Sequence, residues 1–410
     1  MSGVRHILFI NEFFHPDICA SAAVAMDHLR RIARLRGDLR ITVIAGRRAW
    51  HDPAILYPQA EQWEGLDIVR VNRPVVSRRS LLRRAMGFAV FEQNAISAAR
   101  RLDQIDLVIA TTAPPQGASI ARKIARKRRC PYIYKVLDLY PDLAAALGRV
   151  SQRSILYRRW LARDTMLMKQ AARVVCVSQR MAERVAHTRQ IDAAGLLTIH
   201  DGFDPAQLTG GDDETAPNHF IQQYNSEGRF VVQYAGNMGL SHPFETIMQA
   251  CAAMGDREDI LFQFVGDGPQ RAYIREHLPK NGRLIDYQPA DRLGQVLAAA
   301  DVCLISQHEQ MFDKALPYKV YGIFAAGKPT IFIGSERSEI AEWVRRHEAG
   351  LCVEQGQGDA LVQAICAIKG EPARAERMGR SARQLAEGVL HSRLAAERWT
   401  ALIGDVLAEG

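Results

Sequence analysis

The sequence predicts an α/β protein built from two doubly wound domains, each with a parallel sheet between layers of helices. Short apolar runs alternate with amphipathic helical stretches along the whole chain, which is the pattern of successive strand–helix units. The chain has 410 residues, whereas a single core rarely organises more than about 250 to 300 residues. We therefore expect two domains of about 200 residues each.

The composition is that of an ordinary globular protein, with 48% hydrophobic and 24% charged residues. No run of about twenty apolar residues occurs, so no transmembrane helix is expected, and the N-terminal apolar run is too short for a signal peptide. These features favour a cytoplasmic location. The seven cysteines are scattered and form no Cys-x-x-Cys pair, so we expect reduced thiols without disulfides or a zinc site.

The positive charge lies in one half of the chain. Residues 1–210 contain 33 Lys and Arg against 18 Asp and Glu, a net charge of +15, while residues 211–410 contain 20 against 27, a net charge of −7. A basic half favours an anionic surface or acceptor as its partner.

The first domain is expected to begin with a strand at 5–11, whose loop leads to a helix from about Ser21 to Leu35. Ser21 is a suitable N-cap for this helix, and the small residues from Ala20 to Ala23 offer a surface that a sugar or phosphate can approach closely. Further strands are expected at 39–45, 63–71, 106–111 and 131–138.

Residues 77–91 combine cations with apolar side chains. The cations are Arg78, Arg79, Arg83 and Arg84. Such a helix can lie in a membrane interface, and a domain helix with a solvated charged edge fits the same pattern equally well. Nucleic acid is not expected as a partner, because no aromatic platform or known binding motif accompanies the cations.

Two carboxylates follow the strand at 131–138. Asp138 and Asp142 lie in the segment Leu-Asp-Leu-Tyr-Pro-Asp-Leu, at the end of a strand where an acceptor hydroxyl can be bound or deprotonated. Asp142 is equally suited to capping the following helix. Asp138 is a candidate catalytic carboxylate, and a carboxylate at a strand end is about as often a helix cap.

The second domain is expected to contain four strands, each of which ends in a loop. The loops follow strands that begin near Phe230, Ile260, Leu284 and Asp301, and the first two are the glycine turns Gly236–Gly239 and Gly266–Gly268. Parallel strands present their carboxyl ends to one crevice, so these loops should face one ligand.

The stretch 316–329 reads as a short helix followed by a buried strand. Pro317 opens the helix and Lys319 places a cation in its first turn. Unpaired N–H groups and a cation at a helix start suit a diphosphate. An ordinary crossover helix has the same pattern, so the diphosphate reading depends on the neighbouring loops.

Taken in order, four segments resemble the donor half of retaining GT-B glycosyltransferases of family 4. They are Tyr-Ala-Gly-Asn-Met-Gly, Val-Gly-Asp-Gly-Pro, Ala-Ala-Ala-Asp-Val-Cys-Leu and Leu-Pro-Tyr-Lys-Val-Tyr-Gly-Ile-Phe-Ala-Ala-Gly-Lys-Pro. Within the family, the sequence is most similar to the exopolysaccharide and O-antigen enzymes of the colanic-acid type. The resemblance covers nearly the whole chain.

This resemblance implies a GT-B architecture, in which two Rossmann-like domains face each other across a cleft. It implies an acceptor- and membrane-facing domain at 1–208, a linker at 209–228, a donor domain at 229–385, and a C-terminal helix at 386–410 that returns to the first domain.

By the same resemblance, the donor site is formed by the glycine turns and the helix that carries Lys319. Its expected residues are Gly236, Asn237, Met238, Gly239, Gly266, Asp267, Gly268, Tyr287, Gln288, Pro317, Tyr318, Lys319 and Glu339. The Tyr287–Gln288 turn would lie beside the base. Glu339 is equally suited to a role at the next helix start.

The sequence departs from the family pattern at three places. Two glutamates are common around the Lys319 helix, and Lys314 and Gly322 occupy their positions; Asn237 or Met238 stands where a basic residue is usual. Lys319 is therefore the leading candidate for the missing phosphate charge.

The resemblance predicts transfer of a sugar from a nucleotide-diphosphate sugar to a lipid-linked saccharide at the inner face of the cytoplasmic membrane. The chain has no Asp-x-Asp triplet, so no metal or other cofactor is expected. Three alternatives stay open: transfer to a small soluble acceptor, a GT-B epimerase, and a nucleotide-sugar-binding module without catalysis.

Overall fold

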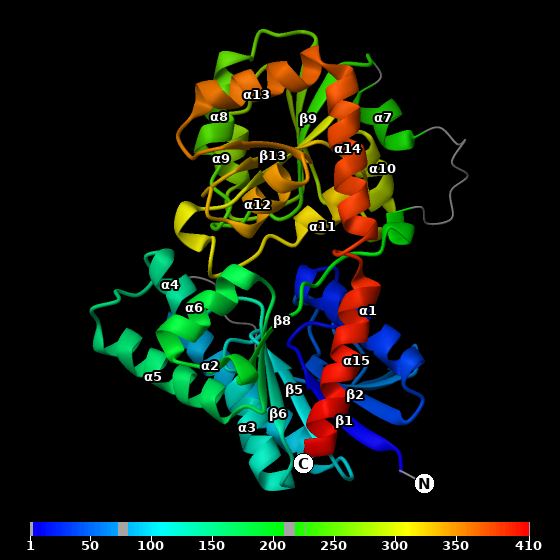
Figure 1. The fold of residues 1–410 in the computed structure, drawn as a ribbon, viewed down its shortest axis with the longest axis vertical. Helices are drawn as coiled ribbons and strands as arrows, with labels where there is room; N and C mark the ends of the chain where they lie inside the picture. Colours follow the sequence, from blue (N-terminus) through cyan, green and yellow to red (C-terminus); the bar gives the residue numbers. More distant parts are fainter. Residues whose placement is uncertain (1–2, 73–80, 209–217, 226, 410) are drawn as a thin grey trace. The chain divides into compact units, whose positions relative to one another are not determined.

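The structure is a computed structural model that describes residues 3–72, 81–208, 218–225 and 227–409. The chain divides into two compact units (Figure 1). Unit 1 comprises Met1–Asp201, Lys314–Leu316 and Ser392–Gly410, and unit 2 comprises Gly202–Asp313 and Pro317–His391. Within the described residues, no helix is both long and apolar enough to span a bilayer.

Unit 1 contains an eight-stranded sheet in the order β3-β4-β2-β1-β5-β6-β7-β8. Its strands are β1 (Arg5–Ile10), β2 (Leu39–Gly46), β3 (Ala60–Trp63), β4 (Leu66–Val71), β5 (Leu107–Thr111), β6 (Tyr132–Val136), β7 (Arg173–Cys176) and β8 (Leu196–Thr198). Its helices are α1 (Ala20–Leu35), α2 (Leu81–Arg100), α3 (Gly117–Arg128), α4 (Asp142–Ala146), α5 (Ile155–Gln170), α6 (Gln179–Arg189) and α15 (Ser392–Glu409).

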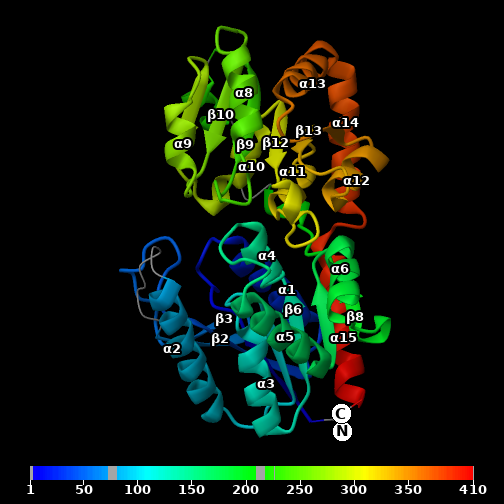
Figure 2. The same ribbon diagram turned by 90° about the vertical axis from the view of Figure 1, so that its left-hand side faces the viewer.

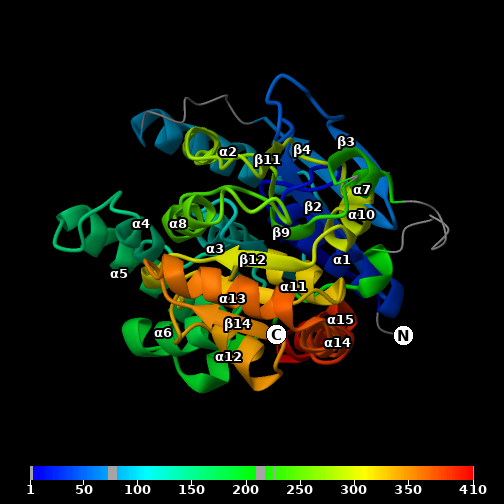
Figure 3. The ribbon, with the colours of Figure 1, turned by 90° about the horizontal axis from the view of Figure 1, so that it is seen from above.

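Helices cover both faces of this sheet, which is why its central strands are almost continuously apolar. Leu29 of α1 and Trp399 of α15 share one core with the sheet, while Phe91 of α2 and Ile124 of α3 share the core on the opposite face. Seen from above, α1 and α15 lie together and α2 lies across the sheet from them (Figure 3). The last helix of the chain is thus part of unit 1.

The strand expected at 63–71 is instead a hairpin of β3 and β4. Glu64 and Gly65 have φ values of 49° and 82°, and two consecutive positive φ values make a tight turn that reverses the chain. β3 consequently pairs antiparallel with β4 at the sheet edge. The sheet is otherwise parallel, as predicted.

The first helix also begins differently from the expectation. α1 starts at Ala20 with Cys19 in the N-cap position and without a side-chain cap. Ser21 lies inside the first turn, so its hydroxyl is beyond the position from which a cap acts. The prediction that Ser21 caps the helix was wrong.

Unit 2 contains a six-stranded parallel sheet in the order β11-β10-β9-β12-β13-β14. Its strands are β9 (Phe230–Ala235), β10 (Ile260–Val265), β11 (Gly282–Ile285), β12 (Val302–Ser306), β13 (Thr330–Ile333) and β14 (Gly350–Val353). Its helices are α7 (His219–Tyr224), α8 (Glu245–Ala253), α9 (Arg271–Glu276), α10 (Leu293–Ala298), α11 (Lys319–Ala325), α12 (Glu339–Arg346), α13 (Gly358–Gly370) and α14 (Pro372–Glu387).

Two boundaries of unit 2 differ from the predicted segments. The stretch 209–228, expected to be a linker, includes α7, because the Asn218 side chain accepts hydrogen bonds from the N–H groups of Phe220 and Ile221 and so caps that helix. The helical region expected from residue 386 is divided between α14, which ends at Glu387, and α15, which begins at Ser392.

Candidate functional site

The strand order of unit 2 identifies one edge of its sheet as the candidate site. The chain proceeds outward from β9 through β10 to β11, and then crosses to β12 and continues through β13 to β14 on the other side. Ligands of doubly wound sheets bind at the carboxyl ends of the strands where this direction reverses. The loops after β9 and β12 flank that point, and Gly236–Gly239 form the first of them.

The two glycine turns touch each other, and this contact requires glycine. Gly236 and Gly266 have φ values of 120° and 134°, and a Cβ on Gly266 would lie 2.2 Å from the Gly236 carbonyl oxygen. The N–H of Gly236 donates to Val265 and that of Met238 donates to Asp267. The turns are therefore held together by their own backbones.

This geometry corrects two expectations for the glycine loop. The N–H groups of Gly236 and Met238 are already occupied, so only those of Asn237 and Gly239 are free of protein acceptors among the described residues. The Met238 side chain is fully buried in the core, because the turn directs it inward, and it is not a ligand contact. Asn237 is exposed at the tip of the turn.

Lys319, the first residue of α11, brings its amine to the glycine loop. Nζ lies 3.5 Å from the centroid of the Tyr234 ring and 3.5 Å from the point where a Cβ on Gly236 would stand. The amine is buried and has no hydrogen-bond partner among the described residues. Burial lowers its pKa well below the ordinary value, because a charged amine without a partner is unfavourable there.

His242 is a further polar group beside this amine, and it was missed from the sequence. Its Nδ1 lies 2.7 Å from the carbonyl oxygen of Ser306, the last residue of β12. A carbonyl only accepts, so Nδ1 carries the proton and Nε2 is left as an acceptor. Burial, and then the nearby Lys319, lower the pKa of His242 to about 3. Its position three residues after Gly239 is the only sequence signal of this role.

The turns after β10 and β11 lie on the same edge of the sheet. The Asp267 carboxylate accepts from the N–H of Gly268 at 2.8 Å, which closes that turn. Tyr287 is 38% exposed, and the Gln288 amide donates to the Asp286 carbonyl at 3.0 Å. An exposed ring beside a fixed turn suits stacking on a base, and this role stays a prediction.

The remaining donor candidates lie at the starts of α11 and α12. Pro317 is buried, Tyr318 is the N-cap residue of α11, and the two aromatic rings of Tyr318 and Tyr321 lie 5.5 Å apart. Ser338 caps α12 by accepting from the N–H of Ile340. Glu339 is the first residue of that helix and is 4% exposed.

The two positions where glutamates are common differ in their surroundings. Gly322 lies inside α11, and the nearest atom to an added Cβ there is a Leu297 methyl group at 3.8 Å. Lys314 is buried and is grouped with unit 1, where its carbonyl accepts from the N–H of Leu139. Position 314 is a lysine and position 322 a glycine, so neither supplies the carboxylate that a glutamate would provide there.

In unit 1 the structure separates Asp138 from Asp142. The Asp142 carboxylate is buried and accepts from Arg184 and Arg189, whose guanidinium groups lower its pKa. The backbone N–H of Asp138 donates to the Thr112 hydroxyl at 3.0 Å, and its backbone forms a β-bridge with Ala315. Burial raises the pKa of Asp138 to about 6. Of these two carboxylates, that of Asp138 has no side-chain partner among the described residues, so it is the one available to bind a hydroxyl.

The other acceptor-side candidates are placed only in part. Ala20 is exposed at the start of α1, and the carbonyl of Ser21 accepts from the Asn11 side chain at 3.3 Å. Arg78 and Arg79 lie outside the described residues. Arg83 and Arg84 belong to the first turn of α2, and their side chains are also outside the described part.

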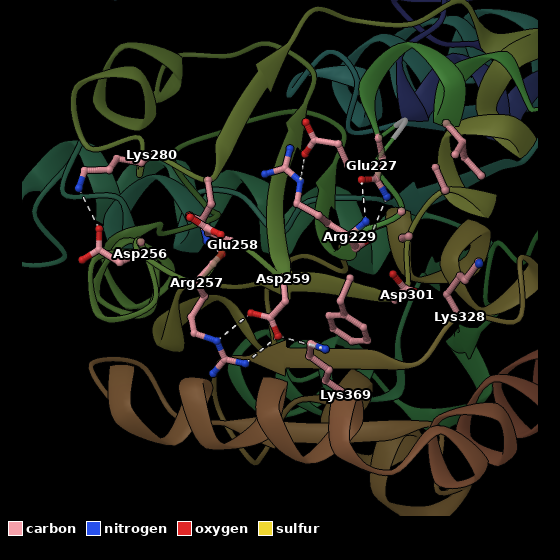
Figure 4. A pocket seen from close by; sticks show the side chains of 18 of the residues that line it. Glu227, Arg229, Asp256, Arg257, Glu258, Asp259, Lys280, Asp301, Lys328 and Lys369 are labelled. Atoms are coloured by element: carbon pink, nitrogen blue, oxygen red, sulfur yellow. Dashed lines mark hydrogen bonds and ion pairs between the residues drawn. The ribbon is translucent and has the colours of Figure 1, made fainter.

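A pocket of about 1250 Å³ lies at the opposite edge of the unit 2 sheet (Figure 4). It surrounds the amino ends of the strands, and its charged groups pair with one another. Arg257 and Lys369 both contact Asp259, and Lys280 lies 2.9 Å from Asp256. These pairings leave little free charge for a ligand, so this pocket is not the candidate site.

Two family models match the chain. The model described as Glycosyltransferase Family 4 matches residues 22–207, and the model described as Glycosyl transferases group 1 matches residues 229–369. The first match lies almost entirely in unit 1, and the second almost entirely in unit 2. Together with two Rossmann-like units, they define this protein as a glycosyltransferase with the GT-B fold.

Individual relatives agree with this class. A probable glycosyltransferase, WbjE of Pseudomonas aeruginosa, is 26% identical over 73% of this chain and 74% of its own length. A 2-deoxystreptamine glucosyltransferase of Streptomyces kanamyceticus is 26% identical over 43% of this chain and 51% of its own length. HepE of Anabaena, solved with UDP-glucose, superposes with a TM-score of 0.71 at 15% identity, over 98% of this chain and 99% of its own.

Proposed function

We propose that this glycosyltransferase takes a sugar from a nucleotide-diphosphate sugar held by unit 2. The observation that carries the proposal is the buried Lys319 amine beside the glycine turn Gly236–Gly239, which has no hydrogen-bond partner in the described part of the chain. A buried amine without a partner costs free energy, and a diphosphate oxygen would satisfy it. HepE, which has the same fold, was solved with UDP-glucose, and this also supports a nucleotide sugar as the donor.

In this proposal, hydrogen-bond donors of unit 2 would bind the departing nucleoside diphosphate. Negative charge grows on the leaving phosphate as the bond to the sugar breaks, and preorganised donors aimed at that charge accelerate the step. The Lys319 amine and the N–H groups of Asn237 and Gly239 would supply those donors. His242 Nε2 would accept from a hydroxyl of the donor.

We infer that transfer retains the anomeric configuration and proceeds by substitution on the same face of the sugar. No nucleophile is identifiable in the donor site, so a covalent glycosyl-enzyme is not part of the proposal. Asp138 would bind and deprotonate the acceptor hydroxyl, because its carboxylate has no side-chain partner among the described residues. Trapping a glycosyl-enzyme would contradict this mechanism.

We further propose a lipid-linked, polyprenyl diphosphate saccharide of bacterial exopolysaccharide or O-antigen synthesis as the acceptor. The support is the net charge of +15 on residues 1–210, which suits an anionic acceptor at the inner face of the cytoplasmic membrane. A small soluble acceptor is the second candidate, since one relative is named for glucosyl transfer to 2-deoxystreptamine.

The test is to incubate the purified protein with a panel of nucleotide sugars and with membrane extract from a polysaccharide-producing bacterium. Released nucleoside diphosphate and lipid-linked sugar are measured by mass spectrometry. We expect donor consumption only when lipid is present. Full activity on a soluble acceptor without lipid would establish the second candidate, conversion of the donor alone would indicate an epimerase, and binding without turnover would indicate a non-catalytic module.

A further inference from the structure

The outer face of α5 exposes large apolar side chains next to cations. Ile155 and Leu156, in its first turn, are 69% and 65% exposed. Arg158 and Arg159 follow them and are also exposed. We name these four residues the α5 face. Single exposed apolar side chains are common, but adjacent ones that form a contiguous apolar patch mark an interaction surface more often.

The α5 face lies at the end of unit 1 where the strands end. Arg163 of α5 donates to Ser119 of α3, and Arg122 of α3 donates to Gln170 of α5. These contacts make α5 and α3 parallel, side by side (Figure 2). Leu156 is seven residues before Arg163, so at about 1.5 Å per residue it extends roughly 10 Å beyond the Ser119 level.

α2 belongs to the same layer and adds apolar surface at the same end. The Gln116 side chain, just before α3, donates to the Phe88 carbonyl of α2, and Lys123 of α3 pairs with Glu92. α2 is therefore also parallel to α3. Met86 and Val90 in its first half are 61% and 41% exposed.

A shallow apolar groove continues the α5 face along the helix. It has a volume of about 590 Å³ and includes Leu161, Ala162 and Met166, with Arg158 and Lys169 beside them. Apolar floor and cationic sides are the arrangement that suits an acyl chain below a negatively charged headgroup.

The charge around this face is strongly one-sided. Residues 149–170 contain six Lys and Arg and a single acid, Asp164. Asp164 is buried and lies 3.2 Å from Arg189, so it does not neutralise the surface. Arg153, Arg158 and Arg159 are exposed, and their side chains have no ion pair or hydrogen bond among the described residues.

We propose that the α5 face docks unit 1 on an anionic phospholipid bilayer, with Ile155 and Leu156 inserted and Arg158 and Arg159 on the headgroups. The inference rests on the proposed lipid-linked acceptor, and it assigns membrane contact to a helix that was not singled out in the sequence. Insertion of apolar side chains and attraction of cations to anionic lipid add together.

Flotation with vesicles of phosphatidylcholine and phosphatidylglycerol tests the proposal on the full chain without donor. Ile155→Ser/Leu156→Ser and Arg158→Gln/Arg159→Gln should each reduce vesicle binding at least roughly tenfold. Leu35→Ser, an exposed leucine on α1, and Arg126→Gln/Lys127→Gln, exposed at the far end of α3, are the matched controls. They should bind like the unmodified protein.

Hydrogen exchange gives a second readout that needs no variant. Amides of residues 149–159 should gain protection when vesicles containing phosphatidylglycerol are added, and not with phosphatidylcholine alone. Equal loss of binding in the controls, or protection elsewhere but not here, would overturn the proposal. UDP binding, measured separately, distinguishes the docking proposal from the proposed function. If the unmodified protein binds UDP but not vesicles, only the docking proposal is overturned.

Discussion

At the scale of single residues, Lys319 shows how function and stability make opposite demands. Its amine is buried against the Tyr234 ring and finds no hydrogen-bond acceptor among the residues that the structure describes, which costs stability in the unliganded protein. The same amine would be the strongest single contact for a diphosphate. A residue that is unfavourable for folding and favourable for a ligand is expected at a functional site.

Lys319→Met should therefore stabilise the free protein and weaken nucleotide binding. We expect a gain of about 1 kcal/mol in the free energy of unfolding, and a roughly thirtyfold weaker Kd for UDP, equivalent to about 2 kcal/mol. Denaturant unfolding and titration calorimetry measure the two quantities.

Lys328→Met is the matched control for this prediction. The Lys328 amine donates to the Ala298 carbonyl at 2.8 Å, at the opposite edge of the sheet. Its loss should destabilise the protein and leave UDP binding unchanged. Equal UDP affinity for Lys319→Met and the unmodified protein would remove Lys319 from the donor site.

Asp138 carries a prediction about pH. Its pKa is raised from 3.8 to about 6 by burial, so the folded protein binds a proton there that the unfolded chain releases. The stability contributed by this proton falls as the pH rises between those values. The carboxylate needed for catalysis forms over the same range, so kcat/KM should rise through about pH 6.

Asp138→Asn should abolish the rise of kcat/KM through about pH 6, which we call the pH-dependent limb, and should lower the rate roughly hundredfold. It should also be more stable than the unmodified protein at neutral pH, because no charge is then buried. Asp142→Asn is the comparison, since it breaks a buried ion pair and should destabilise by about 3 kcal/mol without removing the limb. A limb that persists in Asp138→Asn would exclude Asp138 as the base.

At the scale of elements, the contact between the glycine turns after β9 and β10 fixes the shape of the glycine loop Gly236–Gly239. Gly266→Ala would place a Cβ 2.2 Å from the Gly236 carbonyl oxygen and would strain a φ of 134°. We expect a loss of at least about 2 kcal/mol in stability and loss of UDP binding.

Gly322→Ala, on α11, should have the opposite effect on stability. The nearest atom to its Cβ is 3.8 Å away, and alanine in a helix interior is favoured by about 0.5 to 1 kcal/mol over glycine. Thermal unfolding should show stabilisation for Gly322→Ala and destabilisation for Gly266→Ala. The same sign for both would show that the turn contact does not determine the loop.

The sequence predicted elements better than it predicted contacts. The buried strands and the loop positions at their carboxyl ends follow from apolar runs and glycines, and the parallel sheets were predicted correctly. The hairpin at 60–71 was missed because its turn depends on two positive φ values, at Glu64 and Gly65. The inward Met238 and the His242 contact with Ser306 depend on packing between distant segments, which one sequence does not reveal.

At the scale of the whole molecule, the two ends of the chain belong to the same unit. α15 places Trp399, Leu402, Ile403 and Val406 in the core that also contains Leu29 and Ile32 of α1. Burial of four such side chains contributes about 6 kcal/mol or more, comparable with the net stability of a domain. Unit 1 thus requires both ends of the chain.

Unit 2, by contrast, is nearly continuous in sequence, because only Lys314–Leu316 interrupt it between Gly202 and His391. All of the donor-site groups described above, from the Gly236 turn to Lys319, lie within this range. A fragment of residues 202–391 should therefore fold alone and bind UDP with a Kd within roughly threefold of the full chain, since binding depends on preorganised groups of one unit.

Titration calorimetry of this fragment against UDP, with circular dichroism to establish folding, checks the prediction. The fragment with Lys319→Met should lose affinity by the same factor as the full chain carrying that substitution, because the glycine turn Gly236–Gly239 and position 319 both lie within the fragment. A chain truncated after His391 should keep UDP binding while its unit 1 loses cooperative unfolding. A folded fragment that fails to bind UDP would show that donor binding requires groups from unit 1, and would contradict a donor site confined to unit 2.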